Sequence, residues 1–300
     1  MTTTAPSGLA ELLPSWLLTL KASNKAPKTI KAYEEGVRLF LGWCERTGTG
    51  AALSRPVVSA FVASLFEAGQ SANTARSRQV AVKRFSAWCA LEGEIAVDEL
   101  AGLPQPRLHT KITDPLTELE LRDLIDACKG PAFRDRRDEA IVRLMAETGM
   151  RAGECAGLAL ADVDVTRGVA TVHRAKGGRA RLVPFGTVCA QSLDRYIRMR
   201  RSHPQTTSPA LWLGERGQPF AYLGLYRALQ RRAALAGIDR FHPHLLRHTA
   251  APRWLAAGGS EGGLMAVAGW RSREMLDRYT AATASSRAAE EARRLRLGDL

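Results

Sequence analysis

The stretch HPHLLRHT at residues 242–249 is followed by AGW at 268–270 and LDRYT at 276–280. His244 and Arg247 stand three residues apart, so one turn of a helix would place both side chains on one face. Tyr279 adds a phenol, which is a poor nucleophile at neutral pH because its ordinary pKa is near ~10. Fixed positive charge favours the phenolate and also neutralises the charge that develops on a phosphodiester under attack. The stretch therefore predicts a site in which a phosphate lies between cations and Tyr279 attacks it.

Two further basic residues lie upstream of this stretch. Arg151 occurs in TGMRAGE, and Lys176 occurs in HRAKGGRARLVP between two strand-like runs. With them, the carboxy-terminal motifs resemble the tyrosine recombinase (phage integrase) family in order and spacing, over nearly the whole chain. The most specific parts are the His-x-x-Arg-His run at 244–248, the 23-residue step from Arg247 to Trp270 and the nine-residue step from Trp270 to Tyr279.

The resemblance implies a catalytic set and a role for each member. The set is Arg151, Lys176, His244, Arg247, Trp270 and Tyr279. The two arginines would grip the non-bridging phosphate oxygens, since a planar guanidinium donates two parallel hydrogen bonds and stays charged. His244 would bind the phosphate and exchange the tyrosyl proton, and Lys176 would protonate the departing 5′ oxygen. Attack would leave a 3′-phosphotyrosine and a free 5′ hydroxyl, with no cofactor and no metal.

Several of these positions have ordinary alternatives. Arg151 can pair with Glu154, and Lys176 can be a solvated turn lysine with Arg179 and Arg181 as neighbouring cations. His242 is a decoy beside His244, and His248 is expected to buttress the site. The rival phenols are Tyr33, Tyr196, Tyr222 and Tyr226, none of which follows a glycine-tryptophan pair at the matched distance.

Two positions depart from the common family pattern. Trp270 stands where that pattern has histidine, so its indole N–H can bind phosphate but cannot shuttle protons, and a pure packing role is equally compatible. Pro252 follows Arg247 by five residues. Because proline is tolerated in the first turn of a helix and costly deeper inside, we expect a helix start or a kink near residue 252.

The chain is expected to be mainly α, with two domains. Apolar periodicity predicts four amino-terminal helices at 9–22, 29–47, 56–67 and 72–91. The resemblance implies that residues 1–105 form a helical, SAM-like core DNA-binding domain, that 106–115 form a linker, and that 116–300 form the catalytic domain. There, helices are expected from Thr117 to about 128, over 135–148, from about 188 and 223, and around His244 and Tyr279. Runs 168–175 and 180–185 predict a small antiparallel sheet.

Charge and cysteine content narrow the partners and the compartment. The formal net charge is +13, and residues 106–300 hold 32 Lys/Arg against 21 Asp/Glu, whereas 1–105 hold 11 against 9. Such an excess favours a polyanion. Five cysteines without a C-x-x-C pair favour a reducing cytoplasm over a zinc site or disulfides. The apolar run at 9–20 is too short for a bilayer and is broken by Glu11 and Pro14, so no membrane role is expected.

DNA contacts outside the catalytic set are expected on two helices, although a merely solvated face is equally compatible. The candidates are Lys28, Lys31, Arg76, Arg78 and Lys83. The tail at 285–300 predicts a final helix. In the family such a segment docks on a neighbouring protomer, although here it can also fold back on its own chain.

The combined interpretation is a simple two-domain, Xer-like site-specific DNA recombinase. It would act in DNA integration and excision as a tetramer on two duplexes, with an accessory directionality factor as a further partner. Two alternatives keep the same chemistry, namely resolution of plasmid or chromosome dimers and type IB topoisomerase-like relaxation. A third, from another class, is a DNA-binding protein that occupies sites without cutting.

Overall fold

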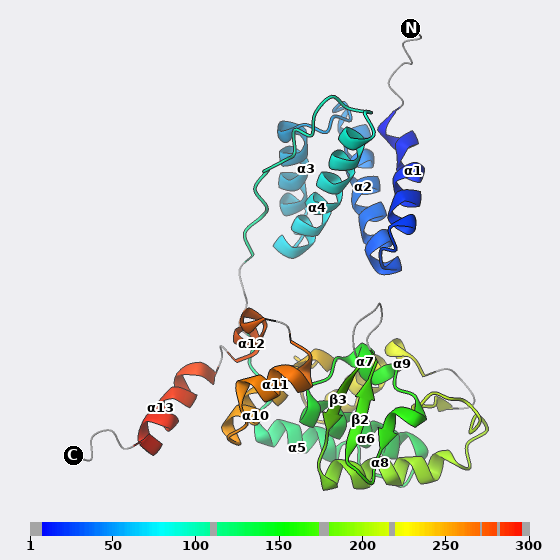
Figure 1. The fold of residues 1–300 in the computed structure, drawn as a ribbon, viewed down its shortest axis with the longest axis vertical. Helices are drawn as coiled ribbons and strands as arrows, with labels where there is room; N and C mark the ends of the chain where they lie inside the picture. Colours follow the sequence, from blue (N-terminus) through cyan, green and yellow to red (C-terminus); the bar gives the residue numbers. More distant parts are fainter. Residues whose placement is uncertain are drawn as a thin grey trace. The chain divides into compact units, whose positions relative to one another are not determined.

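The computed structural model describes residues 8–108, 113–173, 180–215, 220–270, 272–280 and 283–295 (Figure 1). The chain divides into two compact units, Met1–Lys111 and Ile112–Leu300. Helices form most of both units, and one small antiparallel sheet lies in the second. The mainly α fold class is confirmed.

The amino-terminal unit contains four helices within its described residues. They are α1 (Leu9–Ala22), α2 (Pro27–Thr47), α3 (Arg55–Glu67) and α4 (Ala72–Leu91). The predicted bounds match for α1 and α4. The other two begin earlier than predicted, because Pro27 and Pro56 occupy the first turns of α2 and α3, where proline needs no hydrogen-bond donor.

Aromatic side chains from all four helices fill the core of this unit. Trp16 packs on Phe85 with ring centroids 5.1 Å apart, and Phe40 meets Phe61 edge-on at 5.4 Å. Phe40 and Phe85 are fully buried. These two residues lie in the similar runs RLFLGWC (38–44) and KRFSAWC (83–89). The similarity of the two runs therefore reflects core packing.

The carboxy-terminal unit begins with helices α5 (Glu118–Asp126), α6 (Phe133–Thr148) and α7 (Ala152–Ala156), then a short 3-10 helix (Leu160–Asp162). Strands β1 (Val163–Asp164), β2 (Val169–Val172) and β3 (Arg181–Pro184) pair antiparallel in that order, with Ala170 opposite both Val163 and Val183. The later helices are α8 (Thr187–Arg200), α9 (Tyr222–Leu235), α10 (Pro243–Ala256), α11 (Glu261–Ala268), α12 (Arg273–Thr280) and α13 (Ala284–Leu295). Of these elements, β1, α7, α11 and the 3-10 helix were not predicted.

Helix α6 is the centre of this unit and leads the chain into the region of Arg151. Residues Ala140, Ile141, Leu144 and Met145 on it are fully buried. The helix ends at Gly149, which has the left-handed backbone φ of 62° that glycine adopts without strain. A capping box of Thr117 and Glu120 begins α5, where a helix was expected from Thr117.

Helix α10 excludes a helix start at Pro252, one of the two expected outcomes. The helix starts at Pro243 and runs without a break to Ala256, so no helix begins at 252. Pro243 is the proline that occupies the tolerated first turn. Pro252 lies buried inside the helix, where its lack of an N–H leaves the carbonyl of His248 without its usual helical partner.

The close approach of α2 and α4 gives a test of the amino-terminal core. A Cβ atom added at Gly36 would lie 2.5 Å from the Ala81 Cβ, whereas one added at Gly42 would meet only the flexible end of Arg46, at 3.3 Å. We expect Gly36→Ala to lower the free energy of unfolding by about 1–3 kcal/mol through overpacking. Gly42→Ala, the control in the same helix, should raise it by up to about 1 kcal/mol. Urea denaturation of the full chain measures both, and equal stabilisation by the two variants would contradict the close crossing.

Candidate active site

Helix α10 carries His244 and Arg247 into a buried corner of the carboxy-terminal unit. The Arg247 side chain is 1% exposed. Its Nη1 donates to the carbonyl of Gly149 at 2.6 Å and to the carbonyl of Ala268 at 2.8 Å. These carbonyls lie at the ends of α6 and α11, so one guanidinium joins three helices.

Tyr279 on α12 lies against this corner in the same chain. Its Oη is 2.7 Å from the His244 Nε2. The phenol ring stacks on the Trp270 indole, with centroids 4.8 Å apart and planes 18° apart. The Arg247 guanidinium lies 4.9 Å from the Trp270 ring centroid and 5.3 Å from that of Tyr279. Four of the six predicted residues therefore form one cluster, in which His244, Arg247 and Trp270 each contact Tyr279.

Three buried hydrogen-bond donors in this cluster have no partner within the part of the chain that the structure describes. They are the Nε and Nη2 of Arg247 and the Nε1 of Trp270. A buried unpaired donor costs about 1–3 kcal/mol, and more when it is charged. Such donors indicate a place where a ligand supplies the acceptors, and phosphate oxygens are suitable acceptors.

Arg151 is the residue that precedes α7, two positions after Gly149. Its side chain is 40% exposed, and its Nη1 donates to the Glu154 carboxylate at 3.1 Å. Arg151 also lies close enough for its charge to contribute to lowering the pKa values of Arg247 and His244. It therefore belongs to the same electrostatic site, and the pairing with Glu154 that the sequence left open is present.

Burial changes the protonation of the two histidines. Burial, and then the charge of Arg247, lower the pKa of His244 to about 4. Burial, and then His244, lower the pKa of His248 to about 4. Both imidazoles are therefore neutral at pH ~7. The His248 ring packs 4.5 Å from the Tyr279 ring centroid, which fits the expected buttressing position.

Arg247 stays charged near neutral pH despite its burial. Burial, and then the charge of Arg151, lower the pKa of its guanidinium to about 10. Among the described residues of the site, positive charge at neutral pH therefore comes from arginine.

Lys176 and its alternative Arg179 lie outside the described residues. Arg181, the other alternative, is described: it donates two hydrogen bonds to Glu154 and one to a backbone carbonyl. The sequence contained no signal for this contact or for the two carbonyls that hold Arg247, because backbone acceptors leave no trace in residue type.

The rival tyrosines lie away from this cluster. Burial raises the pKa of Tyr196 to about 12, and its hydroxyl donates to the Leu211 carbonyl. Tyr222 and Tyr226 pack on each other on α9, and Tyr33 stacks on Trp16 in the amino-terminal unit. His242 precedes α10 as its cap residue. Among the described tyrosines, Tyr279 is the one in contact with His244.

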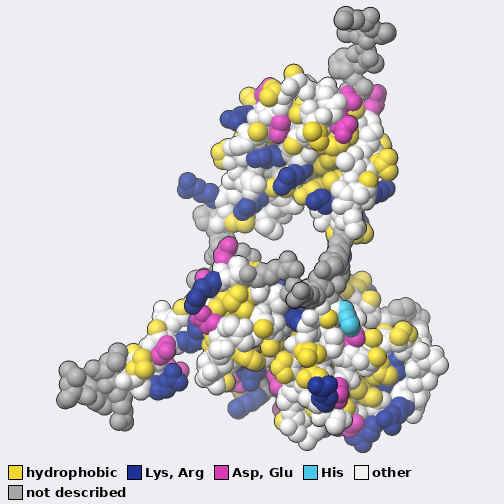
Figure 2. Space-filling model, viewed as in Figure 1, with side chains coloured by type: hydrophobic (Ala, Val, Ile, Leu, Met, Phe, Trp, Pro, Cys, Tyr) yellow, Lys and Arg dark blue, Asp and Glu magenta, His cyan; other side chains and the backbone are white. Residues whose placement is uncertain are grey.

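The predicted DNA-contact residues differ in their surroundings. Lys28 and Lys31 on α2 are exposed. On α4, Arg76 is half-buried, Arg78 pairs with Glu35 at 2.6 Å, and Lys83 donates to the Leu103 carbonyl at 2.7 Å. Figure 2 shows Lys and Arg side chains spread among apolar ones on one face of the amino-terminal unit. Arg78 and Lys83 thus have structural partners, and their role toward DNA stays a prediction.

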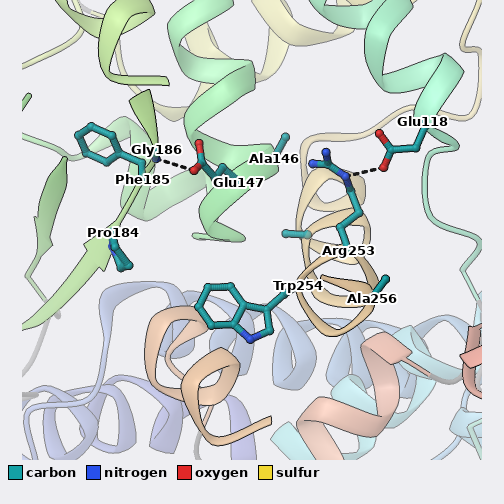
Figure 3. Close-up of a pocket in the computed structure, with 10 residues that line it drawn as sticks. Glu118, Ala146, Glu147, Pro184, Phe185, Gly186, Arg253, Trp254 and Ala256 are labelled. Carbon is teal, nitrogen blue, oxygen red and sulfur yellow. Dashed lines mark hydrogen bonds and ion pairs between the residues drawn. The ribbon is translucent and has the colours of Figure 1, made fainter. Parts of the chain in front are cut away.

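A cavity of about 530 Å³ borders helix α10, but none of the predicted catalytic residues lines it (Figure 3). Arg253 and Glu118 form an ion pair at 2.6 Å on its wall, and the Trp254 indole borders it.

The described residues contain no group of three or more His, Cys, Asp or Glu that could hold a metal ion. Within the same residues, no helix is long and apolar enough to cross a membrane.

Comparison with known families identifies the chain. Residues 115–286 match the model of the phage integrase family, and residues 13–93 match the phage integrase N-terminal SAM-like domain. The chain belongs to the phage integrase family. It is thus a tyrosine-type site-specific DNA recombinase, and the resemblance inferred from its motifs is confirmed.

Individual relatives agree with this assignment. The recombinase is 32% identical over 226 residues to tyrosine recombinase XerC of Corynebacterium efficiens, which covers 75% of this chain and 72% of the relative. Its fold is similar to that of the XerH site-specific recombinase bound to a palindromic difH substrate, with a TM-score of 0.74, 19% identity, and coverage of 96% and 85% of the two chains. It is also similar to a lambda integrase tetramer bound to a Holliday junction, with a TM-score of 0.69, 17% identity, and coverage of 88% and 77%.

The lowered histidine pKa values predict a pH dependence of stability. His244 and His248 have folded-state pKa values of about 4, against 6.5 in the unfolded chain, so the unfolded chain binds more protons between these values. Stability should therefore fall as the pH drops below about 6.5, by up to about 1.4 kcal/mol per pH unit for each histidine. Urea denaturation between about pH 7 and about pH 5 should show a shallower fall in the double variant His244→Gln/His248→Gln. An unchanged slope in that variant would contradict the neutral, buried state of both rings.

Proposed function

We propose that this recombinase cleaves and rejoins DNA strands through a 3′-phosphotyrosine formed by Tyr279, in DNA integration and excision. The observation that supports this most is the 2.7 Å contact of the Tyr279 Oη with His244, beside three buried donors that have no partner among the described residues. A nucleophile, its proton acceptor and the binding groups for a phosphate thus meet in one chain.

His244 is proposed to take the tyrosyl proton. Its pKa of about 4 keeps the imidazole neutral, so Nε2 can accept a hydrogen bond from the phenol. When a phosphodiester enters, its negative charge beside His244 favours the imidazolium and draws the proton from Tyr279. The phenolate then attacks phosphorus, and the 5′ oxygen leaves with a proton that we assign to Lys176.

The remaining residues are proposed to stabilise the five-coordinate phosphate. Arg247 offers Nε and Nη2, Trp270 offers Nε1, and Arg151 brings an exposed guanidinium to the rim. Donors that are already in place cost no reorganisation when charge develops on the oxygens, so each commonly contributes a factor of about 10² to 10³ in rate. The chemistry uses a phenol and the chain's own cations, and we therefore expect it to proceed in EDTA.

We also propose a tetramer on two duplexes, linked through α13. A lambda integrase tetramer on a Holliday junction, whose fold is similar, is one support. The other is that α13 exposes its apolar side chains in the single chain, including Leu295 at 55%. A cytoplasmic location, a mobile-element origin and an accessory directionality factor belong to the same proposal, and dimer resolution is compatible with it.

Covalent capture tests the chemistry. A pool of nicked suicide duplexes with randomised cores is incubated with the protein in EDTA, so that the short strand diffuses away after cleavage and traps the adduct. We expect DNA that stays bound to the protein after denaturation, and sequencing of that DNA gives the site. Tyr279→Phe should abolish the adduct because the attacking oxygen is missing.

Tyr226→Phe is the matched control, since it removes a phenol on α9 and should retain the adduct. The absence of any adduct from the wild-type protein would contradict both the recombinase and the topoisomerase mechanism. Two recovered sites on one supercoiled plasmid then distinguish these two: exchanged products support recombination, and relaxation alone supports the topoisomerase-like alternative.

The role of α13 has its own test. Ala292→Asp combined with Leu295→Asp places charge on the exposed apolar face, and we expect loss of complexes that hold two duplexes, because burying those carboxylates is costly. Cleavage on one duplex should persist. Native gels measure assembly, and Glu290→Gln on the opposite face is the control. Wild-type assembly by the double variant would contradict docking through this face.

A further inference from the structure

Arg181 is a largely buried cation that the proposed mechanism does not use. It is the first residue of β3, and its side chain is 9% exposed. Each of its three guanidinium nitrogens donates a hydrogen bond: Nε to the Val267 carbonyl at 2.8 Å, and Nη1 and Nη2 to the two Glu154 oxygens at 3.1 and 2.7 Å. A planar fork in which every nitrogen donates a hydrogen bond is more than a surface charge requires.

The Glu154 end of this contact leads to Arg151. Glu154 Oε1 also accepts from the Arg151 Nη1 at 3.1 Å, and Oε2 accepts from the Arg151 backbone N–H at 2.9 Å. Burial raises the pKa of this carboxyl, but hydrogen bonds from Arg181 and from the Arg151 backbone outweigh burial and lower it. One carboxylate is therefore shared by two guanidiniums, and the group carries a net charge of +1.

The Val267 end leads to Arg247 and Trp270. Val267 precedes Ala268, whose carbonyl accepts from Arg247, and the backbone N–H of Trp270 closes the end of α11 onto Met265. Arg181 thus fixes the turn from which Trp270 projects. The Arg181 side chain therefore contacts both Glu154, which binds Arg151, and the end of α11, which binds Arg247 and precedes Trp270.

We propose that Arg181 is a positioning residue that keeps Arg151 available to phosphate while anchoring the end of α11. Because Arg181 pairs with the negative charge of Glu154, the net positive charge of the group stays with Arg151. Without Arg181, Glu154 and Arg151 would form a neutral pair, and the phosphate would lose that attraction. This inference rests on the proposed function, and it makes a charge prediction that a purely structural role does not.

The test is single-turnover cleavage at saturating protein, with the suicide duplex recovered from the randomised pool as the probe. Arg181→Met should slow adduct formation by about 10²-fold with little change in DNA binding. Adding Glu154→Gln restores the net charge of +1, and the double variant should regain about tenfold of the lost rate. Arg198→Gln, which breaks an exposed ion pair with Asp194 on α8, is the control and should cleave like wild type.

Three results would overturn the proposal. They are wild-type cleavage by Arg181→Met, a loss confined to DNA binding, and a double variant no faster than the single one. If Arg181→Met fails to fold, Arg181→Lys decides: it keeps the charge without the fork, and about tenfold slower cleavage is expected, whereas wild-type cleavage overturns the proposal. The absence of an adduct from the wild-type protein would instead overturn the proposed function, and this inference with it.

Discussion

Arg247 holds a full charge where solvent barely reaches, and the arrangement of the site follows from how that charge is satisfied. Its Nη1 binds the carbonyls of Gly149 and Ala268, at the carboxy-terminal ends of α6 and α11. The negative ends of two helix dipoles therefore face one cation. Arg151 follows the first carbonyl by two residues and Trp270 follows the second by two. The guanidinium thus sets where both of these neighbours enter the site.

The hydrogen bonding of the Arg247 guanidinium is incomplete, and this bears on ligand binding. Nε and Nη2 of Arg247 remain without acceptors in the described part of the chain, as does the indole N–H of Trp270. Burying unpaired donors lowers the stability of the empty protein, and a bound phosphate would recover that cost. The fold thus tolerates an unfavourable corner that is relieved when substrate binds.

Much of the fold can be predicted from the sequence, because it depends on interactions between residues close together in the chain. Long amphipathic helices, the Thr117 capping box and the glycine end of α6 all act within a few residues. The two-residue strand β1 and the five-residue helix α7 are too short for any periodicity, and α10 continues through Pro252 because tertiary packing outweighs one lost hydrogen bond. Motif spacing indicated His244, Arg247, Trp270 and Tyr279 but not Arg181, since its acceptors are a distant carbonyl and a carboxylate 27 residues away.

Trp270 brings together the two roles that the sequence left open. The indole packs flat on the Tyr279 ring under the Arg247 guanidinium, and its N–H has no partner in the described part of the chain. A histidine here would add a titratable group next to a nucleophile, whereas tryptophan adds a donor whose charge never changes. In the proposed mechanism, with His244 and His248 neutral, the charge around a bound phosphate would be set, among the described residues, by Arg151 and Arg247. Proton transfer from Tyr279 would fall to His244, whose Nε2 touches the phenol oxygen. Phosphate binding and proton transfer would then be carried by different residues.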